Sequence, residues 1–291
     1  MIKKIGLVAP SSPLNEDFLE KSVSFFEKRG LEVKVGKHVL DKERFMAGAD
    51  KDRAQDVNEM FADSSVDAIF CLRGGYGSAR CLEYLDYDMI AKNKKPLVGF
   101  SDNTAIQSAL YAKSGLESIS GFTPVPNCFK NVDENLIENI FALVEGKEVT
   151  NKSGKCRVEG IEEGKLVGGC LCLINYLIGT DYCPSFKDKI LFLEEVGEEP
   201  YAVDRLLNHL YQSGVFNDIK GVVWGNFEGC VAKDSNDGTI EQVIEEWNQR
   251  INKPAIVDFI YGHQPKRLPL LIGSKAKVDF TNATISQKLC I

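Results

Sequence analysis

The stretch Leu97-Val-Gly-Phe-Ser-Asp-Asn-Thr-Ala-Ile106 runs from a short apolar segment straight into a segment of helical pattern. The same order recurs along the first half of the chain. The apolar runs, at residues 5–9, 31–35, 66–72 and 96–100, are rich in β-branched residues and bounded by glycine, proline or charge, as buried strands are. Amphipathic segments lie at residues 15–29, 50–62, 102–113 and 133–145. This alternation predicts a mostly parallel sheet with helices on both faces.

The composition changes near residue 147. Residues 147–160 are rich in Lys, Glu, Ser, Asn and Gly and poor in apolar residues, as linkers are. The chain beyond them has a less regular pattern, which begins with a glycine-rich apolar stretch at residues 166–177. Strands are predicted at 189–195, 219–227, 255–260, 270–273 and 275–280, and helices from Pro200 onward and at 240–247. We therefore expect an α/β protein with an N-terminal domain at 1–146, a linker at 147–160 and a smaller C-terminal α/β domain at 161–291.

The charge balance and the apolar runs restrict the partners. The 291 residues include 35 Lys and Arg against 42 Asp and Glu, a formal net charge of -7. Nucleic acid and anionic membranes recruit clustered basic residues, so we expect neither as a partner. No apolar run approaches the roughly 18 residues of a membrane helix, and the N-terminal run ends at Pro10, too early for a signal peptide. These features predict a cytoplasmic protein.

The cysteines are odd in number and scattered, which is unlike a disulfide framework. The chain has no Cys-x-x-Cys pair, and Cys170-Leu-Cys172 has no histidine close by in the sequence to complete a zinc site. We expect reduced, mostly buried thiols and no metal. The nine are Cys71, Cys81, Cys128, Cys156, Cys170, Cys172, Cys183, Cys230 and Cys290.

Ser101 stands where the predicted strand meets the predicted helix. A nucleophile elbow uses this junction because it exposes the hydroxyl and directs backbone N–H groups at the substrate. The Gly-x-Ser-x-Gly pattern is incomplete, since Asn103 replaces the second glycine. The alternative is that Ser101 only caps the helix that begins at Asp102.

A glycine-rich loop, Leu72-Arg-Gly-Gly-Tyr-Gly-Ser-Ala-Arg80, also joins a predicted strand to a helix. Its glycines allow a ligand to approach the backbone, and its N–H groups can face an anion. A dinucleotide fingerprint is a weaker interpretation, because Arg80 occupies the third glycine position and the loop follows the third strand. A tight turn without further function is the remaining interpretation.

Acidic residues and a histidine complete the candidates. Glu194 and Glu195 end an apolar strand, where an open α/β sheet places its active site, although acids before a helix also serve as caps. Of the three histidines, His38 has a surface context and His209 lies within a predicted helix. His263 follows a strand in a loop beside glycine and proline, which suits a catalytic base.

Together these motifs resemble one family. Arg73-Gly-Gly-Tyr-Gly77, Gly99-Phe-Ser-Asp102, Leu193-Glu-Glu-Val-Gly197 and Gly262-His-Gln-Pro265 have the order and spacing of the LD-carboxypeptidases, serine peptidases of bacterial cell-wall recycling. The similarity extends from Gly6-Leu-Val-Ala-Pro-Ser-Ser12 to the closing strands. It implies a flavodoxin-like N-terminal domain that holds the nucleophile, a C-terminal domain that holds its partners, and an active site between them.

The resemblance also implies the site residues and the reaction. Ser101, Glu194 and His263 match the family's triad, and backbone N–H groups at Gly75 and Asp102 match its oxyanion hole. The implied reaction removes the terminal D-alanine from a murein tetrapeptide through an acyl-enzyme, in a cytoplasmic homodimer, without metal or cofactor. Glu195 could replace Glu194, but neighbouring strand residues point to opposite faces, so only one of the two can face the histidine.

Two other functions stay open from the sequence. A microcin-immunity peptidase, which cleaves a peptidyl-nucleotide, would share the fold, but that branch lacks the Val196-Gly-Glu198 continuation present here. A non-catalytic two-domain binding protein would share the architecture, yet all three triad positions carry competent residues.

Overall fold

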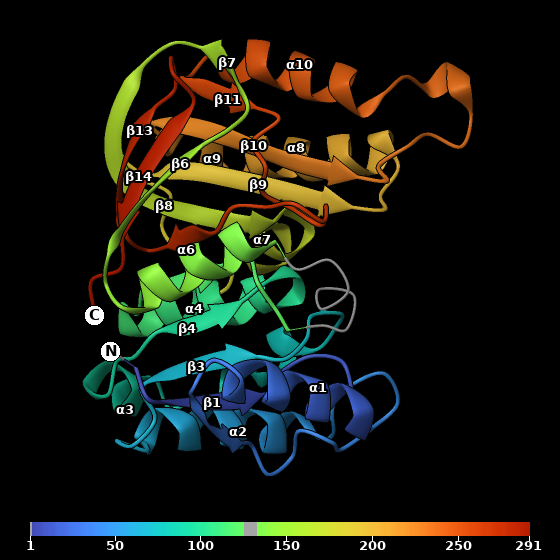
Figure 1. Ribbon diagram of the computed structural model, residues 1–291. Coiled ribbons are helices and arrows are strands. Elements are labelled where there is room, and N and C mark those ends of the chain that lie inside the picture. Colours follow the sequence, from blue (N-terminus) through green and yellow to red (C-terminus); the bar gives the residue numbers. More distant parts are fainter. Residues whose placement is uncertain (1, 125–132) are drawn as a thin grey trace.

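The computed structural model describes residues 2–124 and 133–291, so Cys128 lies outside the described residues. It contains two β-sheets, one built mainly from the first half of the chain and one from the second half (Figure 1). Both sheets carry helices, which confirms the predicted α/β class. Among the described residues, no helix is both long and apolar enough to cross a lipid bilayer.

The first half alternates strands and helices as predicted. Its elements are β1 (Lys4–Val8), α1 (Glu16–Glu27), β2 (Glu32–Val35), α2 (Asp50–Ala62), β3 (Ala68–Cys71), η1 (Ser78–Tyr84), α3 (Tyr87–Lys92), β4 (Leu97–Gly99), η2 (Ser101–Asn103), α4 (Thr104–Ser114), β5 (Ser118–Ser120) and α6 (Glu134–Val144).

Local signals account for the ends of the helices. The Asn15 side chain accepts a hydrogen bond from the Phe18 N–H and so caps α1. Gly115 follows α4 with a left-handed backbone that ends the helix. In the second half, Pro200 opens α8 and a capping box of Thr239 and Gln242 opens α10.

The first sheet has the strand order β12-β5-β4-β3-β1-β2. The five strands from the first half are parallel, in the order 2-1-3-4-5 of flavodoxin-like folds. In such sheets ligands bind beyond the carboxyl ends of the strands. The loops after β1, β3 and β4 therefore form the natural place for a site.

The second half forms the second sheet, with the order β6-β14-β13-β8-β9-β10-β11-β7. Its four central strands, β8 to β11, are parallel, and the outer strands are antiparallel. The elements are β6 (Glu148–Lys152), β7 (Lys155–Val158), β8 (Ile161–Cys170), α7 (Leu171–Leu177), β9 (Ile190–Val196), α8 (Pro200–Gln212), α9 (Val215–Asp218), β10 (Gly221–Glu228), η3 (Ser235–Asp237), α10 (Ile240–Ile251), β11 (Ala255–Val257), β12 (Leu270–Ile272), β13 (Lys275–Asp279) and β14 (Thr284–Lys288).

The structure differs from the prediction in two places. The segment predicted as a linker contains β6 and β7, the two edge strands of the second sheet. The predicted strand at residues 270–273 appears as β12, but it pairs with β5 and so extends the first sheet. All three residues of β12 are fully buried, which explains why this apolar segment returns to the other sheet.

Helix α4 lies where the two halves meet (Figure 1), because it contacts β4, β5 and β12 of the first sheet as well as β8 and α7 of the second half. The sequence predicts an amphipathic helix at residues 102–113, but α4 has only a weak amphipathic pattern. The reason is that every residue from Thr104 to Leu110 is buried. A helix that is buried on all sides has no need of a polar face. Its N-terminal end, next to Ser101, is fixed by both halves of the protein.

Candidate active site

Ser101 occupies a strained turn. It follows β4 and opens η2, and its φ of 63° lies in the left-handed region that residues other than glycine rarely adopt. A strained residue between a strand and a helix is the geometry of a nucleophile elbow. The alternative, that Ser101 only caps the helix, does not agree with the structure. The residue before η2 is Phe100, no side chain caps η2, and the Ser101 hydroxyl lies beside His263.

The side chains after Ser101 hold the turn in place. The buried Asp102 carboxylate accepts hydrogen bonds from the Ser11 hydroxyl at 2.6 Å and the Ser78 N–H at 2.8 Å. The Asn103 amide donates to the Arg73 carbonyl at 3.1 Å and to the Phe100 carbonyl at 2.9 Å. Asn103, at the position of the second glycine of the Gly-x-Ser-x-Gly motif, thus connects the turn to the glycine-rich loop. The loops after β1, β3 and β4 become one unit.

A chain of hydrogen bonds links Ser101 to two residues of the second half. Ser101 Oγ lies 3.0 Å from His263 Nε2, and His263 Nδ1 lies 2.7 Å from Glu194 Oε2. With the Nδ1–H tautomer, the histidine donates to the carboxylate and its Nε2 accepts from the serine hydroxyl. This is the arrangement of a serine nucleophile, a base and a third group that orients the base.

Glu194 lies at the end of β9 and is fully buried. Its second oxygen, Oε1, has no hydrogen-bond partner among the described residues. A buried carboxylate with so few partners is poorly solvated, and it gains from a positive charge nearby. It is therefore placed to stabilise a protonated His263.

Aromatic rings position the His263 loop. The Phe100 ring packs against the imidazole with centroids 4.8 Å apart, and Tyr261 packs edge-on against Phe100. The buried Tyr261 hydroxyl lies 2.7 Å from the Ser120 hydroxyl on β5. Burial, and next the charge of Glu194, raises the pKa of Tyr261 far above its usual value, so the phenol stays neutral. The hydrogen bond between Tyr261 and Ser120 fixes the His263 loop to the first sheet.

The glycine-rich loop lies directly against Ser101. A Cβ on Gly74 would stand 3.1 Å from Ser101 Oγ, so a side chain here would crowd the reacting hydroxyl. Gly75 has a φ of 104°, which favours glycine, and its N–H donates no hydrogen bond to the described part of the chain. The assignment of the oxyanion hole to the N–H groups of Gly75 and Asp102 stays a prediction, and this placement supports it.

Glu195 and the other histidines lie away from Ser101. The Glu195 carboxylate faces Cys170 and Cys172, on the other side of β9 from Glu194. His38 contacts Asp41, and this hydrogen bond raises the pKa of the imidazole. His209 lies in α8 with Nδ1 2.8 Å from Asn175 Oδ1. Within residues 2–124 and 133–291, only His263 lies within hydrogen-bond distance of the nucleophile.

Two clusters in the described part of the chain have the residue types and spacing to hold a metal ion. One contains Cys170, Cys172 and Glu195, and the other contains His38, Asp41 and Asp52. Neither includes the residues that contact Ser101. The groups that form the hydrogen-bonded chain at Ser101 are a hydroxyl, an imidazole and a carboxylate.

The fold and this site define a serine hydrolase built from two α/β parts. Residues 5–121 match the LD-carboxypeptidase N-terminal domain, and residues 163–278 match the LD-carboxypeptidase C-terminal domain. A probable murein peptide carboxypeptidase of Bacillus subtilis is 32% identical over 288 residues, 96% of this chain and 90% of the relative.

Two solved structures are also similar. One, a muramoyltetrapeptide carboxypeptidase of Oxalobacter formigenes, has a TM-score of 0.88 at 28% identity and covers 98% of this chain and 99% of its own. The other, the microcin C7 self-immunity protein MccF in its wild-type apo state, has a TM-score of 0.90 at 24% identity, with 98% and 96% covered, and at that identity it shows the fold alone. The chain belongs to the LD-carboxypeptidase family, and it is a serine carboxypeptidase.

Proposed function

We propose that this carboxypeptidase removes the terminal D-alanine from murein tetrapeptides, with Ser101 as the nucleophile, His263 as the base and Glu194 as the group that orients it. The observation that carries the proposal is the hydrogen-bonded chain from Ser101 Oγ through His263 to Glu194. The names of the relatives from B. subtilis and O. formigenes support the choice of substrate.

In the acylation step, His263 Nε2 takes the proton of the Ser101 hydroxyl as the oxygen attacks the scissile carbonyl. The imidazole becomes positively charged while Nδ1–H stays bonded to Glu194. The buried carboxylate stabilises this charge and keeps the ring oriented. His263 then gives its proton to the departing amine, and D-alanine leaves as an acyl-enzyme forms.

The carbonyl oxygen becomes negatively charged in the tetrahedral intermediate. N–H groups at Gly75 and Asp102 would donate to it, one from each loop that borders Ser101. Asp102 would have two roles in this step. Its N–H would donate to the oxyanion, and its carboxylate holds the turn at Ser101 in place through hydrogen bonds from Ser11 and Ser78. In the second half of the reaction, water activated by His263 attacks the acyl-enzyme and releases the tripeptide.

The substrate bond joins the L-centre of diaminopimelate or lysine to D-alanine.

We also infer that the enzyme works in the cytoplasm, where imported muropeptides would be trimmed, and as a homodimer. The resemblance to the LD-carboxypeptidase family supports these two statements. Light scattering of the purified chain measures the mass, and a monomer at working concentration would contradict the dimer.

The function is tested by mass spectrometry of a murein tetrapeptide incubated with the wild-type protein and with the Ser101→Ala variant. We expect the wild type to release one terminal alanine and the variant to release none. The matched control is Ser108→Ala, a buried serine of α4 that lies outside the site.

Each other outcome has a definite meaning. Release of D-alanine by Ser101→Ala as well as by the wild type would show that Ser101 is not the nucleophile. If neither protein acts on the tetrapeptide, the substrate is wrong. A peptidyl-nucleotide is then the next substrate to offer, because the fold is shared with the microcin C7 self-immunity protein.

A further inference from the structure

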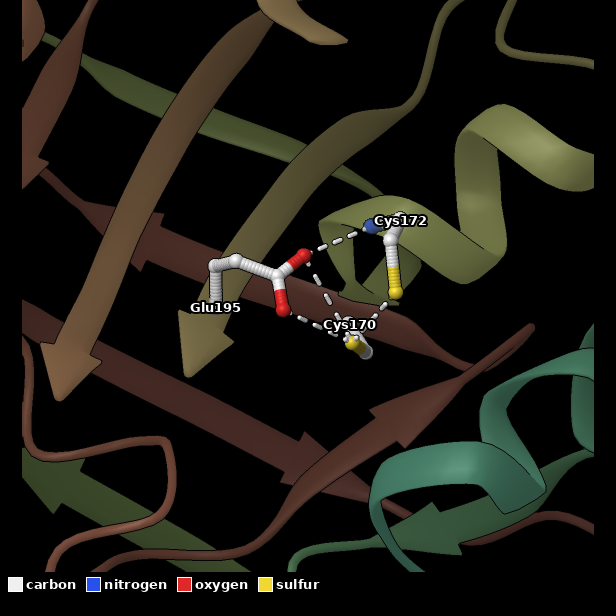
Figure 2. Close-up of side chains that lie close together, drawn as sticks. All are labelled: Cys170, Cys172 and Glu195. Carbon is white, nitrogen blue, oxygen red and sulfur yellow. Dashed lines mark hydrogen bonds between the residues drawn. The ribbon is translucent and has the colours of Figure 1, made fainter. Parts of the chain in front are cut away.

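Two thiols and a carboxylate converge on the side of β9 opposite Glu194. Cys170 Sγ lies 3.4 Å from Cys172 Sγ, and it lies 3.5 and 3.8 Å from the two oxygens of Glu195 (Figure 2). The three side chains come from the end of β8, the first turn of α7 and the end of β9. All three ligand atoms lie within 4.8 Å of one another.

We propose that Cys170, Cys172 and Glu195 bind a thiophilic divalent cation such as Zn²⁺. Zinc is held in proteins by thiolate sulfur, imidazole nitrogen and carboxylate oxygen, with four ligands in a tetrahedron. Here the protein supplies two sulfurs and one oxygen, and water takes the fourth position. Cys172 is only half-buried, so the cluster has access to solvent.

The distances agree with a tetrahedral ion. Zinc–sulfur and zinc–oxygen bonds of about 2.3 and 2.0 Å place two sulfurs about 3.8 Å apart and a sulfur and an oxygen about 3.5 Å apart. The Cys170–Cys172 and Cys170–Glu195 distances differ from these values by a few tenths of an ångström. Small side-chain rotations are enough to place all three atoms around one ion.

The surroundings already orient the ligands. The Glu195 carboxylate accepts the Cys172 N–H at 2.8 Å and the Val196 N–H at 3.0 Å, one on each oxygen. A carboxylate oxygen has a second lone pair, which is left for a metal. The Cys170 N–H donates to Thr104 Oγ1 at 3.1 Å, so the helix behind Ser101 fixes that ligand as well. Such outer contacts strengthen metal sites.

The carboxylate favours a cation over a disulfide. Disulfide formation needs a thiolate to attack, and a negative group beside the thiols works against the thiolate. A cation uses that same group as a ligand. On binding, the two thiols release their protons to solvent, two thiolate–metal bonds form and no electrons are transferred. Two sulfurs select a soft ion, since Mg²⁺ and Ca²⁺ require oxygen ligands.

The test is a titration of the reduced, chelator-treated full chain with Cd²⁺ under argon. Thiolate-to-metal charge transfer is followed in the ultraviolet, and Zn²⁺ competition gives its affinity. We expect one equivalent to produce the band. Cys172→Ser and Glu195→Gln should weaken binding at least about tenfold. The control Cys183→Ser removes another half-buried thiol outside the cluster and should bind as the wild type does.

A thermal measurement gives a second readout. Zn²⁺ should raise the melting temperature of the wild type and of Cys183→Ser by about 2 °C or more and leave Cys172→Ser unchanged. Equal titrations of the wild type and Cys172→Ser would overturn the proposal. So would a reduced protein that shows no band but loses two hydrogens on air oxidation in the wild type and not in Cys172→Ser, because that result identifies a disulfide between Cys170 and Cys172. Neither readout uses peptide turnover, so this test is independent of the proposed function.

Discussion

Glu194 and Glu195 are neighbours in one strand, yet their surroundings have little in common. Glu194 is fully buried, contacts His263 and leaves one oxygen without a partner in the described part of the chain. Glu195 is also buried, but backbone N–H groups satisfy both of its oxygens, and its other neighbour is a thiol. In the described part of the chain, Glu194 has the imidazole of His263 as its hydrogen-bond partner, whereas Glu195 is anchored by backbone N–H groups.

The difference follows from the alternation of side chains along a strand. Glu194 points toward the loop after β11 and the elbow, whereas Glu195 points toward the start of α7. We expect the surroundings of Glu194, with few hydrogen-bond donors, to suit a carboxylate that stabilises a positive charge formed during a reaction. A carboxylate with two backbone donors serves to fix a helix, or to bind an ion that arrives from outside.

The largest expected effect separates the two acids by activity. Glu194→Gln should lower kcat by about 10⁴-fold, because an amide neither stabilises the imidazolium nor holds its tautomer. Glu195→Gln, the matched control, should change kcat by less than about tenfold. Steady-state kinetics on a murein tetrapeptide measures both. Similar losses in the two variants would remove the distinction between the acids.

The next effect separates them by stability. Glu195→Ala leaves the Cys172 and Val196 N–H groups without their acceptor, and we expect a loss of about 1–3 kcal/mol in the free energy of unfolding. Glu198→Ala removes an exposed acid three residues along the chain and should stay within about 0.5 kcal/mol of the wild type. Urea denaturation with a chelator present measures both variants. A stable Glu195→Ala protein would show that this carboxylate does not anchor α7.

A smaller effect concerns the environment of Glu194. Tyr261→Phe removes the hydrogen bond to Ser120 and keeps the ring against Phe100. We expect the free energy of unfolding to fall by about 1 kcal/mol, with kcat within about threefold of the wild type. A large loss of kcat at full stability would instead mean that the phenol takes part in the reaction.

The smallest effect is a dependence on pH. Burial, and to a lesser extent the charge of Glu194, raises the pKa of Glu195 above its usual 4.5. Folding therefore favours the protonated carboxyl. Its contribution to the free energy of unfolding is fully present below pH 4.5, the usual pKa, and is lost as the pH rises through the raised pKa of the folded state. The stability of the wild type relative to Glu195→Gln should therefore fall as the pH is raised from 4 to 7. Urea denaturation of both proteins at several pH values, with a chelator present, measures this difference. A difference that increases with pH would contradict the prediction.

Much of the fold was predictable because it depends on local pattern. The alternation of apolar runs and helical segments predicted four parallel strands of the first sheet and the helices α1, α2, α4 and α6, but not the short α3 between β3 and β4. The structure adds β5, whose sequence Ser118-Ile-Ser120 has too little apolar character to stand out. It also places β6 in the predicted linker, where Val149 is the one apolar residue that faces the core. Pairing partners, such as β5 for β12, depend on distant contacts that no local pattern encodes.

The site was predictable where motifs and resemblance marked it. Ser101, Glu194 and His263 were expected together, and the structure brings them within hydrogen-bond distance, while their catalytic roles stay predictions. The support of the elbow was not predicted, because the bond from Ser11 to Asp102 spans 91 residues. No sequence motif indicates that Glu195 lies beside Cys170, because that carboxylate comes from the adjacent parallel strand.

The return of β12 to the first sheet has a consequence for biosynthesis. The ribosome completes β1 to β5 early, but β5 remains an open edge until the C-terminal part of the chain has been made. Pairing between such distant segments is slow, so a growing chain exposes this edge for longer than a protein with independent domains. The loop that carries His263 precedes β12 directly and is held to β5 through Tyr261. The step that closes the sheet therefore also brings His263 to Ser101, and we expect no peptidase activity before β12 has been made and has paired with β5.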